Sequence, residues 1–144
     1  MSRPEYSCAQ AWAALSAAHA RIAGQLAGAL AHRCGLSVNE FEILLRLHGA
    51  AGARLRLGEL NDFVPLTQPS LSRAVTRLAG RGYVARAGAP GDGRGVLVIL
   101  QPPGAAALAA AIPVHASAIR AALLDRLTPA EQDLLTGVLG RIAE

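Results

Sequence analysis

The chain has 144 residues, enough for one domain with a core of ordinary size. Alanine and leucine dominate while aromatic residues make up only 3%, which favours helices over strands. We expect no apolar run of the roughly 18 residues that a membrane span needs, and the N-terminus has no apolar signal-peptide core. Cys8 and Cys34 are too few for a disulfide framework. These features predict a mainly helical cytoplasmic protein with reduced thiols and no membrane partner, and they leave open whether either thiol is redox-active.

The positive charge is concentrated in one part of the chain. Residues 54–94 contain seven arginines and three acidic residues, which accounts for the whole net charge of +4. A local excess of this kind is typical of a surface that binds a polyanion such as DNA. A basic face that meets only water would give the same count, so charge alone leaves both interpretations open.

The first third of the chain predicts two helices. Apolar residues recur at steps of three or four between residues 9 and 34, which indicates an amphipathic helix. Ser37 and Glu40 have the spacing of a capping box, so a second helix is expected to begin there. Glycines at 49 and 52 are expected to end it.

The middle of the chain alternates short elements. Residues 53–57 alternate polar and apolar side chains, as a short strand does. Residues 57–64 predict a short helix that stops before Pro65, because proline disfavours helical geometry in the residue before it. Thr67 is a good N-cap for the next helix, with Pro69 in its first turn. The expected buried stripe of that helix is Leu71, Val75 and Leu78.

Two strands and two helices complete the chain. Residues 83–87 and 95–100 predict strands joined by a glycine-rich tip. A long helix is expected from Pro102 to about residue 127, kinked at Pro113, and Thr128 should cap a last helix. The order helix, strand, helix, turn, helix, hairpin is that of a winged helix-turn-helix, so the predicted fold class is mainly α with a small β-hairpin.

The helix after Thr67 is the candidate recognition helix. A helix that enters the DNA major groove needs polar and arginine side chains near its N-terminus, opposite an apolar stripe. We expect Gln68, Ser70 and Arg73 to read bases. Thr67 and Ser37 lie at helix N-termini, whose N–H groups favour phosphate. An ordinary amphipathic helix with a hydrated polar face is the alternative.

The stretch between the two strands is the candidate wing. Arg94 is expected to enter the minor groove, where the negative potential is strongest, and Asp92 to orient its guanidinium. The alternative is a common hairpin turn in which these glycine-rich residues supply only backbone geometry.

The middle of the chain resembles a known protein family. Residues 57–104, LGELNDFVPLTQPSLSRAVTRLAGRGYVARAGAPGDGRGVLVILQPPG, resemble the winged-helix core of the MarR (multiple antibiotic resistance regulator) family of bacterial transcription factors. Gly93 departs from the family pattern, in which two consecutive arginines usually follow the Asp of the wing. The complete set of expected DNA-binding residues is Ser37, Thr67, Gln68, Ser70, Ser72, Arg73, Arg77, Arg86, Asp92 and Arg94.

The resemblance also implies an assembly. It implies a single MarR-like domain over 1–144, with a winged core at 36–101 and dimerisation helices at 9–34 and 102–144. Two copies would place their winged motifs on a palindromic operator as a repressor, which a small aromatic effector would release from DNA. Candidate effector-pocket residues are Trp12, His19, Phe41 and His48. The alternative is a set of satisfied core positions, which a lone Trp and scattered His residues on apolar faces more often are.

Other classes of protein fit less well. The chain has no lysine and hence no phosphate-binding P-loop, and its His and Cys residues show no metal-ligand spacing. We therefore expect no enzyme, cofactor or metal. The remaining alternative is a winged-helix protein-interaction module that no longer binds DNA. The operator, the effector, the regulated genes and the choice between repression and activation cannot be read from these residues.

Overall fold

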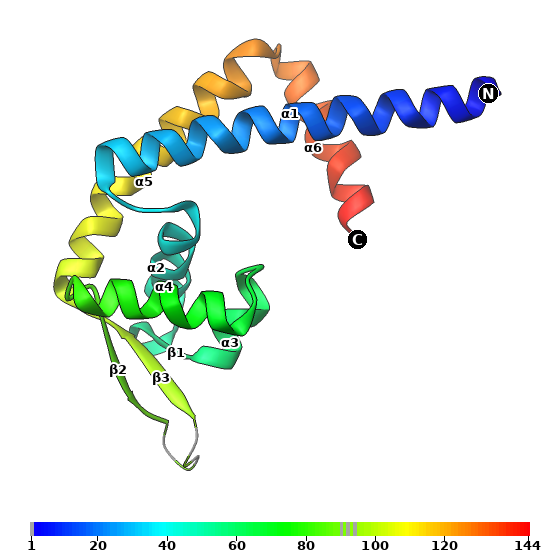
Figure 1. Ribbon diagram of the computed structural model, residues 1–144. Helices are drawn as coiled ribbons and strands as arrows, with labels where there is room; N and C mark the ends of the chain where they lie inside the picture. Colours follow the sequence, from blue (N-terminus) through cyan, green and yellow to red (C-terminus); the bar gives the residue numbers. More distant parts are fainter. Residues whose placement is uncertain (1, 90, 92, 94) are drawn as a thin grey trace. The chain divides into compact units, whose positions relative to one another are not determined.

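The described residues form six α-helices and a small antiparallel sheet (Figure 1). The computed structural model describes residues 2–144 apart from Pro90, Asp92 and Arg94. In chain order the elements are α1 (Arg3–Cys34), α2 (Val38–Gly49), η1 (Ala51–Ala53), β1 (Arg54–Arg56), α3 (Leu57–Phe63), α4 (Gln68–Gly80), β2 (Val84–Gly88), β3 (Val96–Leu100), α5 (Pro102–Ala122), η2 (Leu124–Arg126) and α6 (Pro129–Ala143). This order confirms the predicted winged helix-turn-helix class.

The chain divides into two compact units. The winged unit comprises residues 30–114, and the terminal unit comprises residues 1–29 and 115–144. The winged unit extends beyond the expected 36–101 at both ends. Leu30 and Leu108, which lie in these extensions, are both almost fully buried. The implied division into one winged core and two sets of dimerisation helices stays a prediction.

Helices of the winged unit begin at the predicted caps. The Ser37 hydroxyl accepts a hydrogen bond from the Glu40 N–H at 3.0 Å, and the Ser37 N–H donates to the Glu40 carboxylate at 3.3 Å. Thr67 caps α4 by accepting from the Ser70 N–H. These side chains satisfy N–H groups that the first helical turn leaves unpaired. The predicted stripe of α4 is buried together with Ala74.

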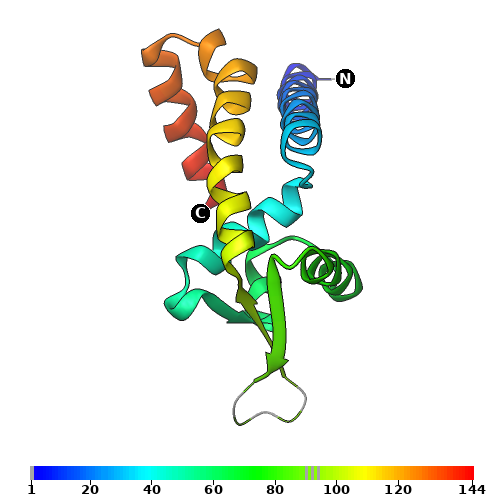
Figure 2. The ribbon, with the colours of Figure 1, turned by 90° about the vertical axis from the view of Figure 1, so that its left-hand side faces the viewer.

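β1 precedes the helix-turn-helix segment formed by α3 and α4, whereas β2 and β3 follow it, so the sheet connects the two ends of that segment. Its strand order is β1-β3-β2, all antiparallel, with Leu55 and Arg86 both opposite Val98. Val98 is fully buried and anchors the sheet to the core of the unit. Figures 1 and 2 show β2 and β3 as a hairpin extending from the winged unit. At its tip Gly91 has φ 75°, the left-handed geometry that the predicted glycine-rich turn requires.

The terminal unit differs from prediction at two helix ends. α1 begins at Arg3 rather than near residue 9, because the Ser2 N–H donates to the Glu5 carboxylate at 2.6 Å and caps an earlier turn. α5 ends at Ala122 rather than about residue 127. The Arg21 guanidinium donates to the Ala122 carbonyl at 3.3 Å and satisfies that helix end. The expected kink at Pro113 stays a prediction.

The expectation that no segment is long and apolar enough to span a membrane was wrong. The segment Pro102–Arg126 is long and apolar enough to cross a membrane by length and composition, although such a helix is weak evidence by itself. Leu108, Ala111 and Val114 of this helix are buried. These three residues belong to the winged unit, so this half of the helix serves as a core element there.

Candidate nucleic-acid interface

The polar face of α4 is exposed while its apolar stripe is buried. Thr67, Gln68, Arg73 and Arg77 are exposed, whereas Leu71 is fully buried in the core of the winged unit. Arg73 and Arg77 lie one helical turn apart, so helical periodicity places both on the side of α4 that faces away from the buried stripe. The exposed part of the helix therefore carries two permanent positive charges, and Gln68 adds an amide in the first turn.

Hydrogen bonds organise the first turn of this face. The Ser70 hydroxyl accepts from the Thr67 hydroxyl at 3.0 Å and from the Arg73 guanidinium at 3.1 Å. The Ser70 N–H donates in turn to the Thr67 hydroxyl at 3.3 Å. Ser70 thus holds the Arg73 guanidinium over the start of the helix. The structure brings these three predicted residues together, and the expected contact of Ser70 with bases stays a prediction.

A contact that sequence reasoning missed joins β2 to α4. The Arg86 guanidinium donates to the Ser72 carbonyl at 3.0 Å and to the Ser72 hydroxyl at 3.1 Å. Figure 2 shows the strand beside the helix. The two residues lie fourteen positions apart, so no local spacing signals their contact. Both were expected to bind DNA, and the structure shows that each has a partner within the winged unit.

The other expected DNA contacts have separate outcomes. Ser37 is exposed, and its hydroxyl is occupied in capping α2. Its contact with phosphate stays a prediction. Asp92 and Arg94 lie outside the described residues, and so does the expected pairing of their side chains.

The four candidate effector residues lie in two different units, and their expected role in binding an effector stays a prediction. Trp12 and His19 line a hollow of about 400 Å³ along α1 in the terminal unit, together with Leu15 and Ser16. Phe41 is only 2% exposed and belongs to the core of the winged unit, so it corrects the expectation of a pocket-lining ring. His48 is exposed on α2. Within the described part of the chain, no group of three or more potential metal ligands is found.

A winged helix-turn-helix with a basic, exposed recognition helix defines a class of protein: the helix-turn-helix regulators. The comparisons narrow this class. Residues 35–95 match the family model described as MarR family. The chain is 31% identical to Sco3205, a MarR family transcriptional regulator from Streptomyces coelicolor solved in complex with DNA, with a TM-score of 0.87 over 100% of this chain and 89% of that one.

Two further relatives agree. AbsC, a MarR family transcriptional regulator from Streptomyces coelicolor, is 26% identical with a TM-score of 0.85 over 99% of this chain and 94% of that one. The HTH-type transcriptional repressor YetL of Bacillus subtilis is 31% identical over 110 residues, which are 76% of this chain and 65% of YetL. The chain belongs to the MarR family of transcriptional regulators, which are not enzymes, and the sequence-based expectation on both points is confirmed.

Proposed function

We propose that the protein is a homodimeric, cytoplasmic repressor that binds a palindromic DNA operator and is released by a small-molecule effector. The observation that carries this proposal is the first turn of α4, where Ser70 holds the Arg73 guanidinium on an exposed face beside Gln68. An arginine held in this way meets the edge of a guanine with less entropy to lose than a freely rotating one.

The expected roles in DNA binding follow from position. Gln68 and Arg73 read base edges in the major groove, and Arg77, one turn further along α4, contacts phosphate. Thr67 and Ser37 lie at helix N-termini that favour phosphate. Asp92 and Arg94 of the wing tip act at the minor groove. Ser72 and Arg86 hold β2 against α4, so they set the placing of the wing relative to the recognition helix.

The terminal unit supports dimer formation. Leu134 is 67% exposed and Ile142 is 70% exposed on α6, and Trp12 is 71% exposed on α1. Leu135 and Leu139 of α6 also line an apolar recess of about 200 Å³ with residues of α1 and with Leu123. Exposure of several large apolar side chains on one unit is unfavourable in water, and a second copy of the chain would cover them.

The test is binding of the purified protein to the DNA upstream of its own gene at several salt concentrations. A dimer that neutralises six or more phosphates should lose about a thousandfold in affinity or more between 50 and 200 mM salt. Tight, specific and salt-steep binding is the expected result. Weak binding that changes little with salt would favour the protein-interaction module instead, because an apolar partner groove releases no counterions.

A further inference from the structure

A side chain of α3 holds the turn between α3 and α4. The Asn61 amide donates through Nδ2 to the Leu66 carbonyl at 2.9 Å. Leu66 directly precedes Thr67, the N-cap of α4. Asn61 is half-buried and is not among the expected DNA-binding residues. The first helix of the helix-turn-helix segment thus reaches the peptide from which the candidate recognition helix begins.

The Leu66 carbonyl lies outside the hydrogen-bond ladder of α4. In a continuing helix it would accept from the N–H four residues later, which is that of Ser70. The Ser70 N–H donates instead to the capping hydroxyl of Thr67 at 3.3 Å. The residue before Leu66 is Pro65, which has no N–H to offer. The Thr67 cap and the Asn61 amide therefore satisfy different backbone groups at the same helix start.

α3 is a rigid support for this contact. Leu60 and Val64, which lie close to Asn61 in the chain, are fully buried in the core of the winged unit. At the end of α3, the Phe63 ring centre lies 5.1 Å from the guanidinium carbon of Arg46 on α2. Because α3 is packed on one side and stacked at its end, the amide that it carries has a fixed position relative to the core.

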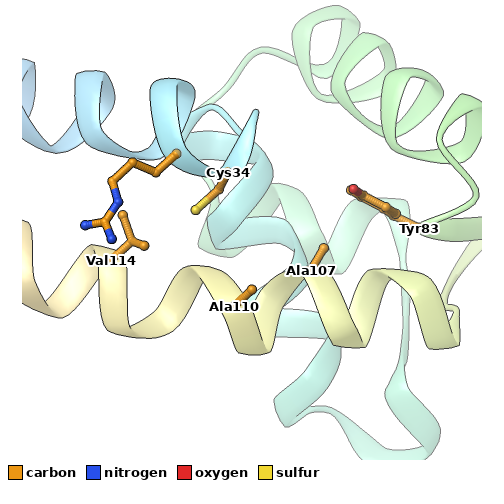
Figure 3. A pocket seen from close by; sticks show the side chains of 6 residues that line it. Cys34, Tyr83, Ala107, Ala110 and Val114 are labelled. Carbon is orange, nitrogen blue, oxygen red and sulfur yellow. The ribbon is translucent and has the colours of Figure 1, made fainter.

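The C-terminal end of α4 is held separately. Arg81, the C-cap of α4, donates to the Gly35 carbonyl at 2.6 Å and to the Tyr83 hydroxyl at 3.0 Å. Figure 3 shows Tyr83 and Cys34, the neighbour of Gly35, which line a recess with Arg33 and small residues of α5. These contacts fix one end of the recognition helix, whereas the contact from α3 acts on the other end.

The start of α4 carries the residue most sensitive to this contact. Gln68 is separated from Leu66 only by the cap residue, and its side chain is exposed. A side chain that reads a base edge has to be placed to within about 0.5 Å. Arg73 lies in the second turn and has its own hydrogen bond to Ser70. A shift of the helix start should therefore displace Gln68 more than Arg73.

We propose that Asn61 is a positioning residue for sequence reading: its amide fixes the start of α4 and thereby places the Gln68 side chain against the base that it reads. The proposal rests on the proposed function, since it concerns how the same interface distinguishes one DNA sequence from another. Asn61 itself makes no contact with DNA in this account. Loss of its amide lowers the preference for the operator over unrelated DNA and leaves the phosphate contacts in place.

Three variants test this role. Asn61→Leu removes the donor, keeps a side chain of similar size and adds no charge. Asn39→Leu is the matched control, because Asn39 is also half-buried on a helix of the winged unit, and within the described part of the chain its side chain makes no hydrogen bond. Asn61→Gln keeps an amide donor and should restore part of the lost function. Urea unfolding checks that each variant is folded.

The first measurement needs no DNA. Hydrogen exchange of the Ser70 and Leu71 amides reports the order of the first turn of α4, because they donate to the hydroxyl and the carbonyl of Thr67. Asn61→Leu is expected to lower their protection about tenfold, whereas Asn39→Leu should leave it as in wild type. Unchanged protection in Asn61→Leu would overturn the positioning role, whatever the DNA results.

The second measurement is the ratio of the affinities for the operator and for unrelated DNA. One good base contact contributes about tenfold or more to this ratio, so Asn61→Leu should lower it about tenfold, Asn61→Gln by less, and Asn39→Leu not at all. The salt slope of binding to unrelated DNA should keep its wild-type value, because the phosphate contacts are unchanged. A wild-type ratio in Asn61→Leu would overturn the role in sequence reading.

A double-mutant cycle tests the route through Gln68. In the Gln68→Ala protein, Asn61→Leu should have no further effect on the affinity ratio, because the side chain that it displaces is already absent. In the Arg77→Ala protein, which lacks an expected phosphate contact, Asn61→Leu should keep its full effect. Equal effects of Asn61→Leu in both proteins would overturn the route through Gln68.

The outcomes separate the two proposals. If the wild-type protein prefers no DNA sequence, the proposed function fails and the role in sequence reading fails with it, although a loss of protection in Asn61→Leu would still show that Asn61 orders the start of α4. If the wild-type protein prefers the operator and Asn61→Leu loses protection without a change in the affinity ratio, the proposed function stands and only the role of Asn61 in sequence reading is overturned.

Discussion

The winged unit and the terminal unit bury their apolar side chains to very different extents. Among the described residues, the large side chains that are fully buried, such as Leu44 and Leu71, all lie in the winged unit. In the terminal unit, Ala122 is a buried residue of small size, while Trp12, Leu134 and Ile142 are more than 60% exposed. The winged unit therefore has a core of its own, and the terminal unit has apolar surface that its own residues leave in water.

Because of this difference, the two units are expected to gain stability from different contacts. Burial of a leucine side chain contributes about 2 kcal/mol, so the winged unit gains most from contacts within one chain. Helices of the terminal unit gain the same term only when another surface covers them. The stability of that unit should then depend on protein concentration, as it does in obligate dimers.

The largest expected effect comes from the winged core. Leu44→Ala should destabilise the protein by about 2–5 kcal/mol, because Leu44 is fully buried and the substitution leaves a cavity. Urea unfolding measures the change. Leu134→Ala is the matched control, since Leu134 is 67% exposed and should cost much less at low protein concentration. Equal losses would contradict the contrast between the units.

A charge on the exposed face of α6 should affect assembly more than folding. Leu134→Asp is expected to weaken the proposed dimer by about 2 kcal/mol or more, because association would bury an unpaired carboxylate. Sedimentation measures the monomer fraction. Phe63→Asp is the control, because Phe63 is also exposed, at 51%, but belongs to the winged unit. Dissociation by Phe63→Asp and not by Leu134→Asp would place the interface elsewhere.

Two arginines of α4 should separate base reading from phosphate binding. Arg73→Ala is expected to cost about 1–3 kcal/mol at the operator and to relax the preference for one base pair. Arg77→Ala should weaken binding to all sequences similarly and reduce the salt slope by about one. Competition gel shifts at several salt concentrations measure both. Identical behaviour of the two variants would contradict the distinction.

The smallest expected effect is a pH dependence in the terminal unit. The hydrogen bond from the Thr128 N–H, followed by the one from its hydroxyl, holds the pKa of Glu131 below its ordinary value of 4.5. Because the folded pKa is depressed, this stabilisation is present above pH 4.5 and is lost as the pH falls through the folded pKa. Protonation should therefore loosen the first turn of α6.

Hydrogen exchange of the Glu131 amide, corrected for intrinsic rates, measures this loosening. In wild type its protection should fall as the solution is acidified below the ordinary pKa of the carboxyl. Glu131→Gln keeps a capping side chain that does not titrate, so its protection should stay level. Asp133→Asn serves as the control and should behave as wild type does.

The elements of the winged unit were predictable because their signals are local. Ser37 with Glu40, and Thr67 with the N–H of Ser70, act over three residues, and the structure shows both caps. Contacts across the fold were not predictable. The hydrogen bond from Arg86 to Ser72 has no local signal, and Phe41 was expected at a pocket but is buried in the core. Both outcomes depend on which element packs beside which.

By itself the sequence determined the helix caps, the buried stripe of α4, the concentration of arginine between residues 54 and 94, and with these the family. Each depends on spacing along one element or on composition, which folding does not alter. Only the tertiary structure decided that Arg81 joins Gly35 to Tyr83, and that small residues of α5 leave a recess beside Arg33. These features need side chains from distant parts of the chain to meet, and their partners are set by packing rather than by sequence spacing.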